Sequence, residues 1–328
     1  MAEPTMRLLM PSAGRKVGLV RALSRYFKVY VGGLADEITA CRLWSPGNFV
    51  ALPPTNTGAF YTELLAVVER LGINVILPVR NEDMAMLGIV RKRLADAGVR
   101  LVMSPDDTVA ACIDKAAMFV KLASHHYHSP VTFTASDWEH LKHPDPFPLF
   151  IKDRYGAGSR AACRVDNEEQ LRLALAANSK LIIQPFINGQ EYTLDMFFDG
   201  RNEAPVQAVL RKRVSVLNGQ MDGGEIVPLP PDVNFQKIMN IGHFFKFCGP
   251  INIQFIQPEY NGQPEYVYYI TDINPRFGGG IGLTIASGAD FAAYLLELVG
   301  NGEIIPRPYK TGLRAACFFD YAYGEREP

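Results

Sequence analysis

The chain has 328 residues, of which 48% are hydrophobic and 20% are charged, an ordinary globular composition with room for two or three compact units. Its 33 Lys and Arg residues nearly balance 34 Asp and Glu residues, and the net charge of −1 at pH 7 argues against a nucleic-acid-binding surface. The five cysteines are scattered without CxxC spacing, which favours a reducing compartment over a disulfide framework. With no signal-peptide pattern and no apolar stretch of membrane length, we expect a cytoplasmic protein without a membrane partner.

Residues 1 to about 110 alternate between short apolar runs and amphipathic segments. This pattern predicts a small parallel sheet of Rossmann-like type with helices on both faces. The expected strands are 7–11, 28–32, 75–78 and 100–103, and the expected helices are 17–26, 61–71 and 83–97. The first turn lacks the G-x-G-x-x-G pattern, so a dinucleotide site is not expected.

Two polar clusters follow the first and third of these strands, at the edge where parallel sheets bind ligands. One contains Ser12, Arg15 and Lys16, and the other is the run from 80 to 83, which reads Arg-Asn-Glu-Asp. Either cluster can line a substrate pocket. Either can equally consist of helix caps and solvated charges.

Residues 266–280 combine oxygen ligands, a cation and glycines. Alternation in a strand places Asp272 and Asn274 on the same face, where they form a candidate chelating pair. Arg276 follows as a fixed cation, and the glycines at 278–280 allow close approach of the backbone to a ligand. Such a set favours Mg²⁺ and a polyphosphate. The alternative is a strand that ends in a glycine turn, with Asp272 and Asn274 as turn caps.

Residues 147–165 resemble a phosphate-binding hairpin. A buried strand ends in Lys152, and the loop after it carries Gly156, Gly158 and Ser159. Glycines let successive backbone N–H groups face one anion, to which the lysine adds a compact charge. The pattern is not a Walker A loop, and a plain hairpin is the alternative.

Three further segments have the polar patterns of a binding site. Asp114 and Lys115 begin a helix, and Glu191 projects from a strand that follows a Gly189 turn. Arg211 and Arg213 share one face of an expected strand, whose end we place near them. They can face a carboxylate or an acyl phosphate, or they can be solvated.

Taken in order, four segments resemble the ATP-grasp superfamily, and more closely its branch related to the large subunit of carbamoyl-phosphate synthetase, of the carboxylate–amine ligase type. They are Asp114 with Lys115, Lys152 with its loop, the run from Gln184 to Glu191, and Gln254 with the DINPR motif at 272–276. The resemblance implies an α/β and α+β architecture, in which a Rossmann-like (pre-ATP-grasp) parallel sheet precedes a two-lobed ATP-grasp fold. It implies domains at 1–112, 113–185 (the small lobe) and 186–328 (the large lobe with the metal site).

The same resemblance implies roles for individual residues. Lys115 and Lys152 would contact phosphates under a lid that carries Gly156, Gly158 and Ser159. The backbone of Gln184, Pro185, Phe186 and Ile187 would bind adenine, and Glu191 would bind the ribose. Mg²⁺ or Mn²⁺ would be held by Gln254, Asp272 and Asn274. Arg276 would contact the phosphates, and Arg211 and Arg213 would hold an acyl phosphate.

The chain departs from the family pattern at three positions. Glu is usual where Asp272 stands and frequent where Gln184 stands, and Pro commonly occupies the position of Asp153. The shorter carboxylate of Asp272 can still ligate a metal ion, although it should move the ion or lose a bidentate contact.

The implied activity uses ATP to convert a carboxylate into an acyl phosphate, which an amine then attacks, with release of ADP and phosphate. The partners would be a small carboxylic acid and an amine, with a homodimer as one assembly state. Three alternatives are phosphorylation of bicarbonate or carbamate, a carboxylate kinase that stops at the acyl phosphate, and a catalytically idle nucleotide-binding module.

The spacing between Gln254 and Asp272 makes a geometric prediction. A two-residue turn at Asn261 and Gly262 would pair Gln254 with Tyr269 and leave its side chain on the opposite face from Asp272. The metal site therefore requires an odd-length loop or a β-bulge in this hairpin.

Overall fold

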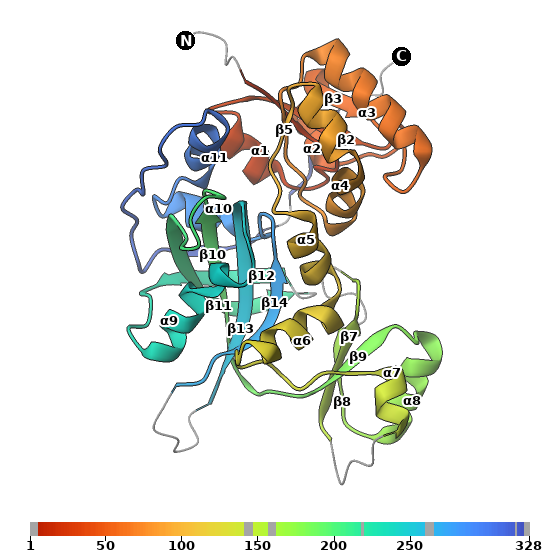
Figure 1. Cartoon of the computed structure of the whole chain (residues 1–328), viewed down its shortest axis with the longest axis vertical. Helices are drawn as coiled ribbons and strands as arrows, with labels where there is room; N and C mark the ends of the chain where they lie inside the picture. The colour runs from red at the N-terminus through yellow and green to blue at the C-terminus, as the bar shows by residue number, and fades with distance from the viewer. Residues whose placement is uncertain are drawn as a thin grey trace.

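Three β-sheets with their covering helices make up the protein, which is described by a computed structural model (Figure 1). The structure describes residues 6–140, 147–156, 162–217, 220–259, 266–318 and 320–324. Within these residues, none of the helices has the length and apolar character needed to cross a membrane.

The N-terminal sheet is parallel, with the strand order β3-β2-β1-β4-β5. Its strands are β1 (Arg7–Met10), β2 (Lys28–Gly33), β3 (Phe49–Ala51), β4 (Val75–Ile76) and β5 (Arg100–Leu101). The helices are α1 (Val17–Leu23), α2 (Ala40–Trp44), α3 (Gly58–Leu71), α4 (Asn81–Asp96) and α5 (Asp106–Ile113), with a 3₁₀ turn at Pro46–Asn48. Leu8 and Met10 pack on one side of the sheet and Leu9 on the other, so both faces are buried. The predicted Rossmann-like sheet is confirmed, although the sequence did not indicate α2, β3 or α5.

The second sheet is antiparallel, with the order β6-β9-β7-β8. It contains β6 (Phe133–Thr134), β7 (Leu149–Asp153), β8 (Cys163–Val165) and β9 (Leu181–Pro185), with α7 (Ala135–His140) and α8 (Glu168–Ala177) beside it. Its small core includes Leu149, Ile151 and Ile183. The preceding helix, α6 (Lys115–Ser124), instead buries Met118 and Phe119 in the core of the third sheet. The domain limits at 112 and 185 stay predictions.

The third sheet is antiparallel and has the order β14-β13-β10-β11-β12-β15. Its strands are β10 (Gly189–Phe198), β11 (Gln207–Leu217), β12 (Gln220–Val227), β13 (Gly249–Pro258), β14 (Tyr269–Asn274) and β15 (Arg314–Ala316). The helical segments are α9 (Val233–Met239), a 3₁₀ turn at Ile241–His243, α10 (Ile281–Ala286) and α11 (Phe291–Val299). One face of this sheet is apolar and packs against α6 and α9 through residues such as Leu194, Ile253 and Phe255.

Three sequence-based boundaries were wrong. The strand that carries Arg211 and Arg213 does not end there but runs on to Leu217, as the β-branched Val214 and Val216 favour. The amphipathic pattern of 235–247 predicts a single helix, but α9 stops at Met239, and Gly242 lies so close to another segment that a Cβ there would be 1.9 Å from the Glu203 carbonyl oxygen. The apolar run at 312–324 predicts a closing strand, of which the structure has Arg314–Ala316 among its described residues.

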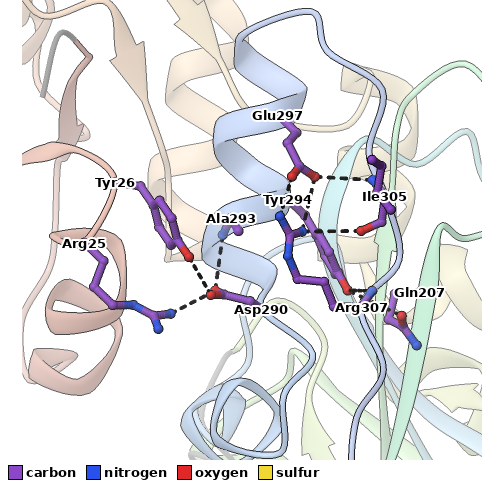
Figure 2. A network of polar contacts seen from close by, with 9 residues as sticks. All are labelled: Arg25, Tyr26, Gln207, Asp290, Ala293, Tyr294, Glu297, Ile305 and Arg307. Atoms are coloured by element: carbon purple, nitrogen blue, oxygen red, sulfur yellow. Dashed lines mark hydrogen bonds and ion pairs between the residues drawn. The ribbon is translucent and has the colours of Figure 1, made fainter.

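A polar network joins the N-terminal unit to α11 (Figure 2). Asp290 caps α11 by accepting from the Ala293 N–H at 3.2 Å, and the same carboxylate accepts from the Tyr26 hydroxyl at 2.7 Å and from Arg25 at 2.9 Å. At the other side of the helix, Tyr294 accepts from the Arg307 N–H at 2.7 Å. These contacts fix the end of α1 against α11, whose side chains share one hydrophobic core.

Asp290→Ala is expected to lower the free energy of unfolding by about 1 to 3 kcal/mol, because α11 loses its cap and the Tyr26 hydroxyl loses its acceptor. Urea denaturation monitored by circular dichroism measures the change. Arg25→Ala is the matched control, since it removes the half-exposed ion pair with Asp290 and exposed contacts to Ala22 and Tyr26 but leaves the cap of α11, and exposed pairs contribute about 0 to 1 kcal/mol. Equal effects of the two substitutions would contradict the capping role.

Candidate active site

The face of the six-stranded sheet opposite its apolar core carries polar and charged side chains. Cross-strand pairing aligns Thr193 of β10 with Arg211 on one side and Gln254 on the other. Side chains directly opposite each other in an antiparallel sheet project from the same face. This polar face therefore gathers the following residues: Glu191, Thr193, Asp195, Arg211, Arg213, Asn252, Gln254, Asp272 and Asn274.

A β-bulge on β14 brings the proposed metal ligands together. Gln254 pairs with Asp272, whereas its neighbour Phe255 pairs with Ile270, so Thr271 is an extra residue on that strand. The predicted irregularity of this hairpin is confirmed. The bulge also reverses the side-chain alternation: Ile270 points into the apolar core while Asp272 lies on the polar face. We had expected every second side chain from Tyr266 to Asn274 to lie on one face of the strand. This prediction was wrong, because the bulge places Ile270 and Asp272 on opposite faces.

The three predicted metal ligands supply oxygen atoms, which Mg²⁺ prefers. Asn274 donates to Asp272 Oδ2 at 2.9 Å, which fixes one carboxylate oxygen relative to the neighbouring amide. Gln254 lies directly across from Asp272 in the ladder. Among the described residues there is no cluster of three His, Cys, Asp or Glu side chains. A set of one carboxylate and two amides is suitable for Mg²⁺, because this ion retains coordinated water molecules and takes its remaining ligands from phosphates.

Lys152 reaches this bulge from the small sheet. Its ammonium group donates to the Thr271 carbonyl at 2.7 Å and lies 4.9 Å from the centre of the Phe119 ring. Burial lowers the pKa of Lys152 to about 8, with a contribution from the Lys115 charge, while Asp272 acts in the opposite direction. Among the described residues Lys152 has no ion-pair partner, and a buried lysine of this kind suits a phosphate oxygen.

Lys115 lies at the start of α6, where Asp114 caps the helix and binds Arg154 through both carboxylate oxygens at 2.6 and 2.7 Å. The Lys115 ammonium group donates to the Gly156 carbonyl, so it contacts the beginning of the predicted lid loop. Gly158 and Ser159 lie outside the described residues.

Residues 186–188 connect the small sheet to the six-stranded sheet. Gln184, at the end of β9, is buried, and its side chain donates to the Thr132 hydroxyl at 2.7 Å. Pro185 is exposed, and Phe186 and Ile187 are half-buried. The Gln184 amide group thus has a partner within the protein, and the Phe186 N–H donates to the Pro148 carbonyl at 3.1 Å. The adenine contact of this connection stays a prediction.

Two arginines predicted to hold an acyl phosphate are engaged with carboxylates. Arg211 is only 2% exposed and binds Asp195 at 2.6 and 2.9 Å. Thr284 donates to the same carboxylate. Arg213 donates to Glu191 at 2.7 Å, and the Glu191 side chain is 43% exposed. Arg213 and Glu191 thus lie next to the solvent-accessible part of the polar face, whereas Arg211 is buried.

Arg276 connects the polar face to the N-terminal sheet. Its guanidinium donates to Asn81 Oδ1 at 2.7 Å, to Asn274 Oδ1 at 2.8 Å and to the Phe277 carbonyl at 3.2 Å. Asn252 donates to the Arg276 carbonyl at 3.0 Å and so holds the backbone of this turn. The sequence reasoning missed Asn252, although its spacing of two residues from Gln254 on one strand was a usable signal.

A cavity of about 430 Å³ lies elsewhere, at the far end of β10, where Asp199 and Val206 face the loop after α11 around Ile304. It shares no residue with the polar face. The predicted site residues therefore lie away from this cavity.

Comparisons with known proteins agree with this architecture. Residues 177–317 match a protein-family model described as ATP-grasp in the biosynthetic pathway with Ter operon. The N5-carboxyaminoimidazole synthetase of Staphylococcus aureus superposes with a TM-score of 0.70 at 14% identity, over 92% of this chain and 79% of that one. The biotin carboxylase of Campylobacter jejuni, a complex with a β,γ-ATP ligand, gives 0.68 at 13% identity, over 92% and 72%.

A third similar structure, the L-amino acid ligase of Bacillus licheniformis, gives a TM-score of 0.67 at 16% identity, over 92% of this chain and 77% of that one. At such identities the likeness concerns the fold. Assignment to the carbamoyl-phosphate synthetase branch stays a prediction. The chain has the ATP-grasp fold, as its four ordered motifs implied, and its residues 177–317 are similar to an ATP-grasp family.

Proposed function

We propose that the protein is an ATP-dependent ligase that activates a small carboxylic acid as an acyl phosphate and joins it to an amine, with release of ADP and phosphate. The contact between Lys152 and the Thr271 carbonyl carries this proposal. It brings a buried cation of the small sheet beside Asp272, so that a phosphate-binding group and a metal-binding group lie together. The names of the similar structures, two of which are a ligase and a synthetase, support the same reaction class.

The reaction begins when a carboxylate oxygen of the acid attacks the γ-phosphorus of ATP. The bond from that phosphorus to the β,γ-bridging oxygen breaks, and ADP leaves. The amine nitrogen then attacks the acyl carbon, the bond to the phosphate oxygen breaks, and the nitrogen loses a proton. Mg²⁺, bound by Gln254, Asp272 and Asn274, would neutralise charge on the phosphate oxygens.

The protein's own groups would orient and neutralise the reacting atoms. Lys152 and Lys115 contribute positive charge where the phosphates of ATP are proposed to lie. Within the described part of the chain, Arg276 hydrogen-bonds to neutral oxygens, and its charge would act on the transferring group. Because these groups are already fixed by hydrogen bonds, little reorganisation accompanies the reaction.

For the rest of the ATP molecule, we propose that the backbone at 185–187 binds adenine and that Glu191 binds the ribose. Arg213 lies beside Glu191 on the polar face and is the better placed of the two arginines to contact an acyl phosphate. Arg211 would act from below, by fixing Asp195 and the turn at Gly280, where a Cβ would come within 2.3 Å of its guanidinium. A cytoplasmic location is part of the same proposal.

A screen with hydroxylamine tests this function. The protein is incubated with ATP, Mg²⁺, hydroxylamine and single carboxylic acids, and nucleotides and hydroxamates are quantified. We expect at least one acid to give ADP and hydroxamate in equal amounts, since hydroxylamine takes the place of the amine. AMP and pyrophosphate as products would overturn the mechanism. In a parallel reaction without any amine, ADP formation sustained over many turnovers would indicate a carboxylate kinase, whereas the ligase should form no more than about one ADP per active site. Nucleotide binding without acid-dependent ADP formation would indicate the idle module.

The affinity for MgADP is expected to fall as the pH rises from about 7 to 9. Lys152 has its pKa lowered to about 8, so it carries its proton below this pH and loses it above, and a phosphate prefers the protonated form. Calorimetric titrations across this range measure the effect. In Lys152→Arg the cation stays charged, and the fall should disappear. An affinity of the wild-type protein that is constant from pH 7 to 9 would contradict the contact.

A further inference from the structure

Asn81 contacts the candidate active site from the N-terminal unit, and no step of the reaction described above uses it. It belongs to the polar run 80–83, which the sequence left open between a pocket lining and plain helix caps. The N-cap residue of α4 is Arg80, and the Asn81 Oδ1 atom accepts a hydrogen bond from Arg276 Nε at 2.7 Å. This contact joins the start of α4 to the turn that follows β14.

The position of Asn81 is fixed by the helix that carries it. Asn81 is the first residue of α4, and it is only 6% exposed. The helix packs on the N-terminal sheet through Leu87, Val90 and Leu94, which belong to the core of that unit. A side chain held in this way keeps a functional group in one orientation. Asn81 therefore offers Arg276 a fixed acceptor on a separate structural unit.

The contact determines which edge of the Arg276 guanidinium is open. Nε binds Asn81 and Nη2 binds Asn274 Oδ1 at 2.8 Å, so the edge formed by these two nitrogens is occupied. Nη1 donates to the Phe277 carbonyl at 3.2 Å. Nη1 and Nη2 each carry a further N–H group, and together they form the edge that can bind an oxyanion through parallel hydrogen bonds. Asn81 thus helps to orient this edge.

The oxygen supplied by Asn81 is neutral. Burial lowers the pKa of Arg276, and the carboxylates of Asp272, Glu82 and Asp83 act in the opposite direction. In the described part of the chain, however, the hydrogen bonds of Arg276 go to carbonyl oxygens and not to these carboxylates. A carboxylate at position 81 would form an ion pair with Nε, and this would weaken the attraction of the guanidinium for a second anion.

Arg276 also transmits the contact to a proposed metal ligand. The Asn274 Oδ1 atom accepts from Arg276, while its Nδ2 group donates to Asp272 Oδ2 at 2.9 Å. The opposite orientation of this amide would direct N–H groups at a guanidinium, which cannot accept them. Arg276 therefore selects the orientation of the Asn274 oxygen, whose second lone pair remains for a metal ion.

We propose that Asn81 is a positioning residue of the ligase, whose neutral oxygen orients Arg276 toward the transferred phosphoryl group and, through Arg276, orients the Asn274 amide. This inference rests on the proposed function, which places the transferred group beside Arg276 and the metal ligands.

Two substitutions of Asn81 separate positioning from folding, with the acid found in the hydroxamate screen as substrate. Asn81→Ala should lower kcat for ADP formation about tenfold or more and leave KM for ATP within about threefold, because Arg276 acts on the group in transfer. Asn81→Asp has nearly the same shape and should keep Tm, since a carboxylate is favourable at a helix N-terminus. A purely structural role predicts normal turnover for Asn81→Asp. Positioning by a neutral oxygen predicts a kcat about tenfold lower, and wild-type turnover would contradict it.

A double-mutant cycle tests whether Asn81 acts through Arg276. In the Arg276→Lys background, Asn81→Ala should change kcat by less than about twofold, because lysine lacks the Nε–H group that Asn81 binds. An equal loss of kcat in both backgrounds would mean that the two residues act independently, and this would overturn the inference.

A measurement without turnover distinguishes this inference from the proposed function. In protein labelled with ¹⁵N-arginine, the Nε–H signal of Arg276 is identified by its loss in Arg276→Lys, and its exchange with solvent is followed by NMR. Exchange should be about tenfold or more slower in the wild type than in Asn81→Ala, since a buried hydrogen-bonded N–H is protected. Equal exchange rates would overturn the role of Asn81 whatever the activity. Slow exchange in a protein that forms no ADP with any acid would instead count against the proposed function.

Discussion

Asp272→Ala is expected to reduce acid-dependent ADP formation by roughly a thousandfold or more, since loss of a metal ligand removes several kcal/mol of charge stabilisation. Asp272 is the one carboxylate among the three proposed ligands. Asn274→Ala should have a similar effect, because Asn274 donates to Asp272 and accepts from Arg276. Quantification of ADP by chromatography, with the acid found in the hydroxamate screen, measures both.

Matched substitutions separate a metal role from a folding defect. Asp272→Glu keeps the carboxylate and introduces the residue usual in the family, so it should retain far more activity than Asp272→Ala. Asp96→Ala removes an exposed carboxylate on α4 and should leave turnover unchanged. Circular dichroism and Tm should be close to the wild type for all three. If the activity of Asp272→Ala stayed within a few fold of the wild type, β14 would not be part of the active site.

Lys152→Met is expected to weaken MgADP binding about 10- to 150-fold, because a hydrogen bond to a charged group contributes about 1.5 to 3 kcal/mol. The substitution should not reduce Tm, since methionine fits an apolar surrounding beside Phe119 and removes a buried charge. Lys180→Met, at the exposed end of the same small sheet, is the control and should bind MgADP normally. Equal affinities of the two variants would indicate that Lys152 does not contact a phosphate and that its loop is a plain hairpin.

Local patterns in the sequence were sufficient to predict the N-terminal sheet, whereas the resemblance of four motifs implied the rest of the architecture. Apolar runs and amphipathic segments before residue 110 indicated the parallel sheet, and the glycine and proline positions separated its elements. Short elements such as β3 and α2 were missed because three to five residues carry too little periodicity. The strand of Arg211 was cut short because a charge run resembles a loop, whereas partners on both sides supply its hydrogen bonds.

The arrangement of the site was predictable only where a geometric requirement could be stated. Gln254 and Asp272 had to share a face, and this demanded the irregularity that the structure has at Thr271. Pairings between distant segments carry no such signal. Arg211 with Asp195, and Arg276 with Asn81, each depend on how separate elements pack, and a single sequence does not encode these distances locally.

A crystal structure with Mg²⁺ and a non-hydrolysable ATP analogue tests the central claim most directly. The account predicts that the β- and γ-phosphates lie between Lys152 and Asp272, with Mg²⁺ bound by Asp272 and Asn274 and adenine against the backbone at 185–187. A nucleotide bound away from the polar face of the six-stranded sheet, or a metal ion that contacts neither Asp272 nor Asn274, would contradict it.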